Sequence, residues 1–321
     1  MQVRSSIFSF NMKNKNIRFF KSVVIVAGVL LFMDFLVGVA GSFIMSKVPD
    51  YSGQFAKDNF RLNRVSSDIV VIGSSRGCHH YVSSMLRDSI NNYTGEQYTL
   101  YNCSIGGKYI VSNSCAAESI MDRYAPKLII FELFDNEFGV INPVQDMEFA
   151  IVNYRSNRFV KQYVDSIGFK ERVKNASNMV RFNQKLPRIV SSFLKQGNES
   201  GYEPLSGEMS GNLKKADSNK KNEKKIDKYS LDKFVRVIKT AKEKGIMLIV
   251  ATSPSYSPDD KNEILIDICS QYDVPYIDLY DLELFNRHPE YFRDPGHLND
   301  KGAHIYTELF FKHLKPYLEE L

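Results

Sequence analysis

The sequence predicts an α/β protein in which helices cover both faces of a parallel sheet, giving three layers. Short apolar runs that end on glycine or polar residues alternate with longer segments of helical spacing. This alternation is typical of parallel sheets with crossover helices. Hydrophobic residues make up 43% of the 321 residues and charged residues 25%, so the chain has enough apolar side chains to bury a core.

Each predicted strand is a short apolar run bounded by polar or turn-forming residues. The five runs cover residues 68–72, 98–102, 127–133, 246–251 and 275–280.

Helical spacing predicts four main helices in the same region. They cover residues 111–124, 230–244, 260–271 and 300–320. In the second of them the apolar residues fall on one face, with Ser230 as the expected N-cap and Gly245 as the expected stop.

An apolar segment near the N-terminus, residues 22–46, is long enough to cross a bilayer as a helix. The central Asp34 costs about 3 kcal/mol, whereas the fourteen Leu, Ile, Val and Phe residues of the segment contribute roughly 0.3 to 0.6 kcal/mol each. Five basic residues and no acidic residue precede the segment. The positive-inside rule therefore predicts a single-pass protein of the inner or cytoplasmic membrane, with residues 1–21 in the cytoplasm and the body outside.

Two features of this segment allow other interpretations. The small residues Ala40, Gly41 and Ser42 would suit cleavage of a signal peptide. Asp34 is either a tolerated single charge or a contact to a membrane partner.

The rest of the chain divides by composition. Residues 47–67 are expected to connect the anchor to a domain over 68–321. Within it, residues 146–195 have helical patterns but no clear strand, which indicates a helical insertion. Residues 196–228 are rich in Gly, Ser, Asn and Lys, which predicts a flexible surface loop.

Charge and cysteine usage exclude two classes of site. The first 47 residues account for the whole net charge of +5, so the body is near neutral and no nucleic-acid partner is expected. The four cysteines form no CxxC pair, and the adjacent His79 and His80 have no ligand cluster around them. No metal and no other cofactor are therefore expected; disulfide pairing is left open.

The first predicted strand ends on Gly73-Ser74-Ser75, and the second is followed by Ser104-Ile-Gly-Gly107. Ligands of open parallel sheets bind at the carboxyl ends of strands. The two hydroxyl groups either cap a following helix or include a nucleophile.

Asp294 and His297 stand three residues apart near the C-terminus, separated by a Pro-Gly turn. An acid that orients an imidazole, which in turn takes a proton from a serine, is the arrangement of nucleophilic acyl transfer. Ser75 would then be the nucleophile, His297 the base and Asp294 the group that orients it. In the alternative, Asp294 caps the last helix and His297 is a surface residue.

Four blocks occur in order along the chain: Gly73-Ser74-Ser75, YNCSIGG over 101–107, Phe134-Asp135-Asn136, and DPGHLNDKGA over 294–303. This order resembles the SGNH (GDSL-like) hydrolase superfamily. More closely, it resembles the membrane-anchored branch of that superfamily found in cell-envelope acyl transfer.

The resemblance implies a flavodoxin-like three-layer fold and the catalytic residues Ser75, Asp294 and His297. It also implies an oxyanion hole formed by the backbone N–H groups of Ser75 and Ser104 and the side chain of Asn136.

Two further residues are candidate substrate contacts, Arg76 and Gly107. Arg76 would meet an anionic substrate, or else pair with an acid.

The expected function is a membrane-anchored, extracytoplasmic serine esterase or O-acyltransferase. Its substrate would be an acylated, in particular acetylated, carbohydrate of the cell envelope. A multi-span membrane acyl donor protein is the expected partner if the acyl group goes to a sugar. The alternative is a non-catalytic binding or assembly protein of the envelope that keeps the same fold.

Overall fold

The fold was taken from a computed structural model of the chain. It describes residues 4–51, 53–139, 142–183, 185–195, 197–198, 200–209, 226–256, 262–286 and 288–321.

Five parallel strands form the central sheet in the order β2-β1-β3-β4-β5. Their bounds are Ile69–Ile72 (β1), Leu100–Asn102 (β2), Leu128–Glu132 (β3), Met247–Thr252 (β4) and Tyr276–Asp278 (β5). This is the flavodoxin-like order, in which a ligand site is expected where the order reverses beside β1. The predicted fold class is confirmed.

Two apolar clusters show that helices cover both faces of the sheet. On one face the cluster combines side chains of α2 (Gly53–Asn63), α5 (Ile110–Arg123), α11 (Lys228–Glu243) and α12 (Glu263–Gln271). On the other it combines those of α4 (Ser83–Thr94) and α14 (Asp300–Leu318). The central strands β1 and β3 are buried along their whole length, as expected where helices cover both faces, and apart from Glu132 they consist of Ile, Val, Leu and Phe.

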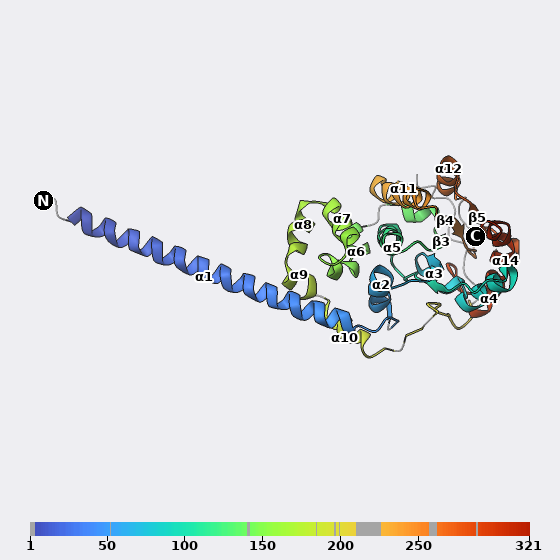
Figure 1. The fold of residues 1–321 in the computed structure, drawn as a ribbon, viewed down its shortest axis with the longest axis horizontal. Helices are drawn as coiled ribbons and strands as arrows, with labels where there is room; N and C mark the ends of the chain where they lie inside the picture. The colour runs from blue at the N-terminus through green and yellow to red at the C-terminus, as the bar shows by residue number, and fades with distance from the viewer. Residues whose placement is uncertain are drawn as a thin grey trace.

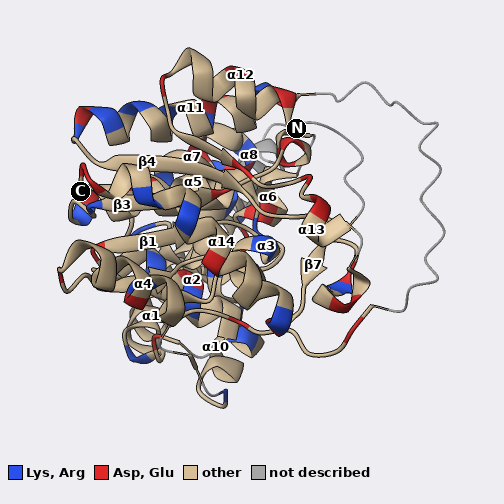
Figure 2. Cartoon of the chain, turned by 90° about the vertical axis from the view of Figure 1, so that its right-hand side faces the viewer, with Lys and Arg blue, Asp and Glu red and all other residues tan. Residues whose placement is uncertain are grey.

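Short elements complete the described chain. They are α3 (Ser75–His80), η1 (Asp135–Phe138), α6 (Pro143–Asp146), η2 (Ala150–Asn153), α13 (Glu283–Asn286), η3 (Pro289–Tyr291), β6 (Phe292–Asp294) and β7 (His297–Leu298). Basic and acidic residues are interspersed over the helices of the body (Figure 2).

The predicted cap of α11 is wrong by three residues. Asp227, not Ser230, is the N-cap, and its carboxylate accepts hydrogen bonds from the backbone N–H and the hydroxyl of Ser230. A carboxylate and a hydroxyl three residues apart both suit the start of a helix, and the sequence does not rank them. Gly245 follows the helix with a φ of 65°, as expected for a C-terminal stop.

Residues 53–63, expected within a connector, form α2 and belong to the core. Arg61 is 0% exposed. Its guanidinium donates to Asp58, to the carbonyl of Cys103 and to the side chains of Ser112 and Asn113. α2 is therefore tied to β2 and α5 rather than linking two independent parts.

The described part of the predicted loop 196–228 runs along the body. Asn102 donates its N–H to Ser200, and Lys57 donates to the carbonyl of Gly201. Gly201 has a φ of 76°, and a Cβ there would lie 2.2 Å from the carbonyl oxygen of Asn102. Residues 200–209 are thus held in place, while the lysine-rich residues 214–225 lie outside the described residues.

Helices fill the described residues of the segment expected as an insertion. They are α7 (Arg158–Ile167), α8 (Phe169–Ala176), α9 (Asn178–Asn183) and α10 (Leu186–Ser192). α7 packs into the core through Phe159, Val160 and Tyr163. α8 and α9 stand on the side of the body from which the long helix α1 (Arg4–Lys47) leaves (Figure 1).

α1 is long and apolar enough, by length and composition, to cross a membrane. Its large apolar side chains between Ile17 and Phe43 are mostly exposed in the isolated chain.

Arg61→Ala is expected to lower the free energy of unfolding by about 3 to 5 kcal/mol, because it leaves Asp58 as a buried carboxylate without its ion partner. Arg64→Ala is the matched control: the Arg64 side chain is 33% exposed, and its ion pair with Asp50 should contribute under about 1 kcal/mol. Urea unfolding of the full chain in detergent measures both. Equal, small losses would contradict the assignment of α2 to the core.

Candidate active site

The site lies at the carboxyl edge of the sheet, where β1 turns into α3. Gly73 lets this turn approach β3, since a Cβ there would lie 2.9 Å from the carbonyl oxygen of Glu132. Ser75 is the first residue of α3, so its backbone N–H has no acceptor within the helix. Ser74 makes no capping bond; its hydroxyl donates to Glu137 at 3.2 Å instead.

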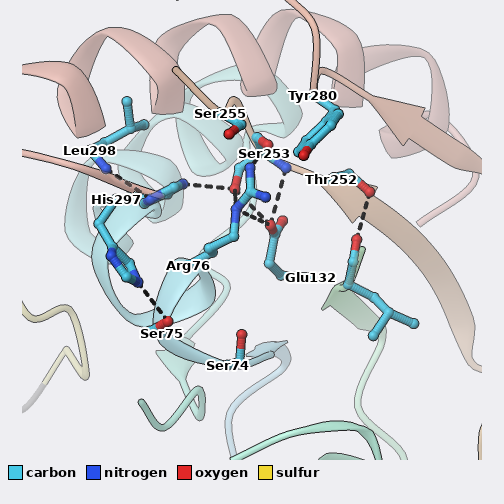
Figure 3. Close-up of polar contacts among 12 residues, drawn as sticks. Ser74, Ser75, Arg76, Glu132, Thr252, Ser253, Ser255, Tyr280, His297 and Leu298 are labelled. Carbon is cyan, nitrogen blue, oxygen red and sulfur yellow. Dashed lines mark hydrogen bonds and ion pairs between the residues drawn. The ribbon is translucent and has the colours of Figure 1, made fainter. Parts of the chain in front are cut away.

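Ser75, His297 and Asp294 form a hydrogen-bonded series. His297 Nε2 lies 2.7 Å from Ser75 Oγ, and His297 Nδ1 lies 2.8 Å from Asp294 Oδ1 (Figure 3 draws the first contact). The carboxylate can only accept, so Nδ1 carries the ring proton and Nε2 accepts from the serine hydroxyl. The imidazole therefore has the tautomer that a general base for Ser75 needs.

A small antiparallel ribbon sets the spacing of the acid and the imidazole. Asp294 ends β6, His297 begins β7, and the two residues pair across the turn. Asp294 does not cap the last helix: Asn299 does so, by accepting from the N–H of Gly302. The side chains of Asp294 and His297 are 50% and 30% exposed, so the series opens to solvent.

A buried histidine, His80, holds the backbone beside His297. His80 is 0% exposed, and its Nε2 accepts from the backbone N–H of Leu298, the residue after His297, at 2.9 Å. Its Nδ1 lies 2.7 Å from Ser253 Oγ. Burial lowers the pKa of His80 well below its usual value of 6.5, so the ring is neutral, and it can hold the backbone next to His297.

Ser253, which contacts His80, is in turn hydrogen-bonded to a buried carboxylate in β3. Ser253, just after β4, donates its hydroxyl to Glu132 at 2.6 Å and its N–H to the same oxygen at 3.1 Å. Tyr81 also donates to Glu132. Burial raises the pKa of Glu132, which is 0% exposed. Figure 3 shows how Glu132, Ser253 and Arg76 face one another behind Ser75.

Arg76 belongs to this support and does not reach outward. It is 5% exposed, lies 3.7 Å from Glu132 and donates to Ser253. Its guanidinium also stacks 5.2 Å from the rings of Phe134 and Tyr280. Of the two predicted roles, the structure shows the pairing with an acid; contact with an anionic substrate stays a prediction.

Ser104 is not available as an oxyanion donor, because its N–H donates to the side chain of Asn102 at 3.0 Å. Of the glycines that follow, Gly106 lies beside Ser75: a Cβ on it would be 3.8 Å from Ser75 Cβ. The N–H of Gly107, which has a φ of 71°, finds no acceptor among the described residues.

Asn136 lies exposed in η1, and its side chain makes no hydrogen bond to the described residues. Its neighbour Glu137 accepts from Ser74, so this loop passes the turn that carries Ser75. Asp135 has a structural role: its carboxylate accepts from the N–H groups of Ile264 and Leu265 at the start of α12.

His79 lies beside His297. Its Nδ1 donates to the carbonyl of Glu203 at 2.6 Å, and its ring meets that of His297 edge to face at 5.7 Å. Among the described residues, no three His, Cys, Asp or Glu side chains gather in a way that could hold a metal ion. All four cysteines are free and buried.

His80, Ser253 and Glu132 were not identified as site residues from the sequence. His80 was considered only as a metal ligand. The sequence does contain one signal of such a network. Glu132 lies in an otherwise apolar strand, and a fully buried carboxylate needs partners.

Two solved structures resemble this chain at low identity. One is a Bacteroides fragilis protein described as an acylhydrolase, with 12% identity and a TM-score of 0.35, over 78% of this chain and 87% of its own. The other is a psychrotrophic esterase from Pseudoalteromonas sp. inhibited by monoethylphosphonate, with 11% identity and a TM-score of 0.42, over 78% of this chain and 98% of its own. The sequence matches no protein-family model and no curated protein. At such identities and TM-scores the likeness says nothing about activity.

The stabilising effect of His80 is expected to depend on pH. At pH 8, His80→Ala should lower the free energy of unfolding by about 1 to 3 kcal/mol, because the buried N–H of Leu298 loses its acceptor. Below the usual pKa of 6.5 the unfolded wild-type chain binds a proton that the folded chain does not. The wild type therefore loses up to about 1.4 kcal/mol per pH unit relative to the variant.

Urea midpoints of both proteins between pH 8 and pH 5 measure this difference. We expect the gap between wild type and His80→Ala to narrow below about pH 6.5. A difference in unfolding free energy that stays constant would show that His80 takes up a proton at the same pH in the folded chain as in the unfolded chain.

Proposed function

We propose that the protein is a membrane-anchored serine ester hydrolase or O-acyltransferase that acts on acyl groups of cell-envelope carbohydrate. The observation that carries the proposal is the Ser75–His297–Asp294 series, in which each group has the partner and the tautomer that acyl transfer needs. The four sequence blocks that resemble SGNH hydrolases support the same reaction class.

In the proposed reaction, Ser75 Oγ attacks the acyl carbonyl carbon while His297 Nε2 takes the hydroxyl proton. Asp294 stabilises the imidazolium that forms. The tetrahedral intermediate expels the alcohol, which takes the proton from His297, and an acyl-serine remains. Water or a sugar hydroxyl, deprotonated by His297, then attacks the acyl-serine, and His297 returns the proton to Ser75 Oγ as the acyl group leaves.

Backbone N–H groups would hold the negative oxygen of the intermediate. We assign this role to Ser75, at the start of α3, and to Gly107 in place of Ser104, because the Ser104 N–H is already bonded to Asn102. Asn136 is the proposed side-chain donor. Each well-placed donor contributes about 3 to 4 kcal/mol to stabilising the transition state.

The proposed location and partner follow from α1. Its apolar length and the five basic residues before the span favour a cytoplasmic N-terminus and an active site on the outer side of the inner or cytoplasmic membrane. An anchored enzyme stays close to a multi-span membrane protein that would deliver acyl groups. With water as acceptor the same site would work as an esterase.

Labelling by a fluorophosphonate probe tests the nucleophile. Wild-type protein is expected to carry one adduct, on Ser75, and to hydrolyse p-nitrophenyl acetate. Ser75→Ala and His297→Ala should lose the label and about 10⁴-fold or more of the hydrolysis rate. Ser74→Ala is the matched control and should keep both, since its hydroxyl faces Glu137.

Mass spectrometry of the labelled peptide locates the adduct. A folded wild type without an adduct, or a Ser75→Ala protein labelled as fast as wild type, would contradict the proposal. The first result would favour a non-catalytic envelope protein.

Two substitutions separate the proposed oxyanion donors. Asn136→Ala is expected to lower kcat by about 10²- to 10³-fold with little change in KM. Ser104→Ala should change kcat little, since the buried Ser104 hydroxyl has no hydrogen-bond partner and the N–H of residue 104 still donates to Asn102. Steady-state kinetics with p-nitrophenyl acetate measures both. An Asn136→Ala protein as active as wild type would remove Asn136 from the oxyanion hole.

A further inference from the structure

The charged residue in the middle of the anchor helix binds another part of the same chain. Asp34 lies midway between Lys21 and Lys47, and its carboxylate accepts from the Ser177 hydroxyl at 2.6 Å and from the N–H of Met179 at 2.9 Å. The Asn178 side chain donates to it at 3.0 Å. Asp34 therefore receives hydrogen bonds from the residues at the start of α9.

α9 also packs closely against α1 beyond Asp34. A Cβ on Gly38 would lie 2.5 Å from the Asn178 side chain, and one on Gly41 would lie 2.5 Å from the Phe182 ring. Positions 34, 38 and 41 share one face of a helix. Small residues on such a face let two helices approach closely within a membrane.

The place of this contact along α1 sets its depth. Asp34 is 13 residues from Lys47, which is about 20 Å along a helix. The hydrocarbon core of a bilayer is about 30 Å thick, or some 20 helical residues. A core that ended before Asp34 would have to take in Lys15, Arg18 and Lys21. A hydrocarbon core that excludes those charges includes the depth of Asp34. It therefore also includes the start of α9, which is bonded to Asp34.

The helices α8, α9 and α10 carry exposed apolar side chains. Phe169 on α8 is 80% exposed, and Leu194 after α10 is 82% exposed. Others are Val173, Met179, Val180, Leu186, Val190 and Phe193. So many large apolar side chains in one segment are unusual in water.

The charged residues of the same segment favour binding to an anionic lipid surface. Residues 168–195 contain seven Lys or Arg residues and one Glu. Long basic side chains reach from buried apolar stems to anionic headgroups. A helix with apolar residues and this excess of basic residues is typical of interfacial membrane segments.

We propose that α8, α9 and α10 are embedded in the bilayer leaflet that faces the α/β body, beside α1. This rests on the proposed role of α1 as a membrane anchor. Anchor and insertion then form one membrane unit, joined through Asp34 to α9. The α/β body is then held at a fixed distance from the bilayer by both segments and not by α1 alone.

Tryptophan quenching tests the embedding, because the chain contains no tryptophan. Four single-tryptophan proteins would be prepared as full chains: Phe169→Trp, Leu194→Trp, Leu31→Trp in α1 and Ile266→Trp in α12. Ile266 is 46% exposed and lies in a helix of the body, so it is the control for an exposed apolar site. Each protein is reconstituted into phosphatidylcholine–phosphatidylglycerol vesicles with and without lipids brominated on the acyl chains.

We expect blue-shifted emission and at least about twofold quenching by brominated lipid for Phe169→Trp, Leu194→Trp and Leu31→Trp, since all three would contact acyl chains. Ile266→Trp should emit as in water and stay unquenched. If Leu31→Trp is quenched while Phe169→Trp and Leu194→Trp are not, the anchor stands and the embedding is wrong. If Leu31→Trp is not quenched either, the proposed anchor is wrong and the embedding falls with it.

Discussion

The geometry of the candidate active site depends on one buried carboxylate, Glu132, and on the hydrogen bonds that it accepts. Glu132 ends β3 beside the turn that carries Ser75, and Ser253 donates to it from the end of β4. Ser253 in turn contacts His80, which accepts from the N–H next to His297. A single series of polar contacts thus joins the ends of the neighbouring strands β3 and β4 to the backbone beside His297.

Burying this polar network costs free energy, and the cost is offset only in the arrangement in which each group has its partner. Arg76 lies 3.7 Å from Glu132 and follows Ser75 directly in the chain, so the same residue compensates the buried charge and fixes the start of α3. A buried network of this kind stabilises one arrangement only when all of its members are satisfied. Ser75 and His297 themselves stay partly exposed, so both side chains are open to solvent while the groups that support them are buried.

Much of this could be predicted from the sequence because the signals are local. Strand runs, the Ser75 turn and the Asp294–His297 spacing are each contained in a few residues, and the five predicted strands all exist. The contacts of Glu132 with Ser253 and of His80 with Leu298 join residues more than 100 positions apart, and no local pattern predicts such pairs. The same reason applies to Asp34, whose partners lie in α9 and just before it.

The central claim is that Ser75 is a nucleophile beside an oxyanion hole made of backbone N–H groups. A crystal structure of the full chain after reaction with a phosphonate ester tests it most directly. The account predicts a phosphorus bonded to Ser75 Oγ, with one phosphoryl oxygen about 2.7 to 3.1 Å from the backbone nitrogens of Ser75 and Gly107. A phosphonate bonded to another residue, or a phosphoryl oxygen directed away from both nitrogens, would contradict it.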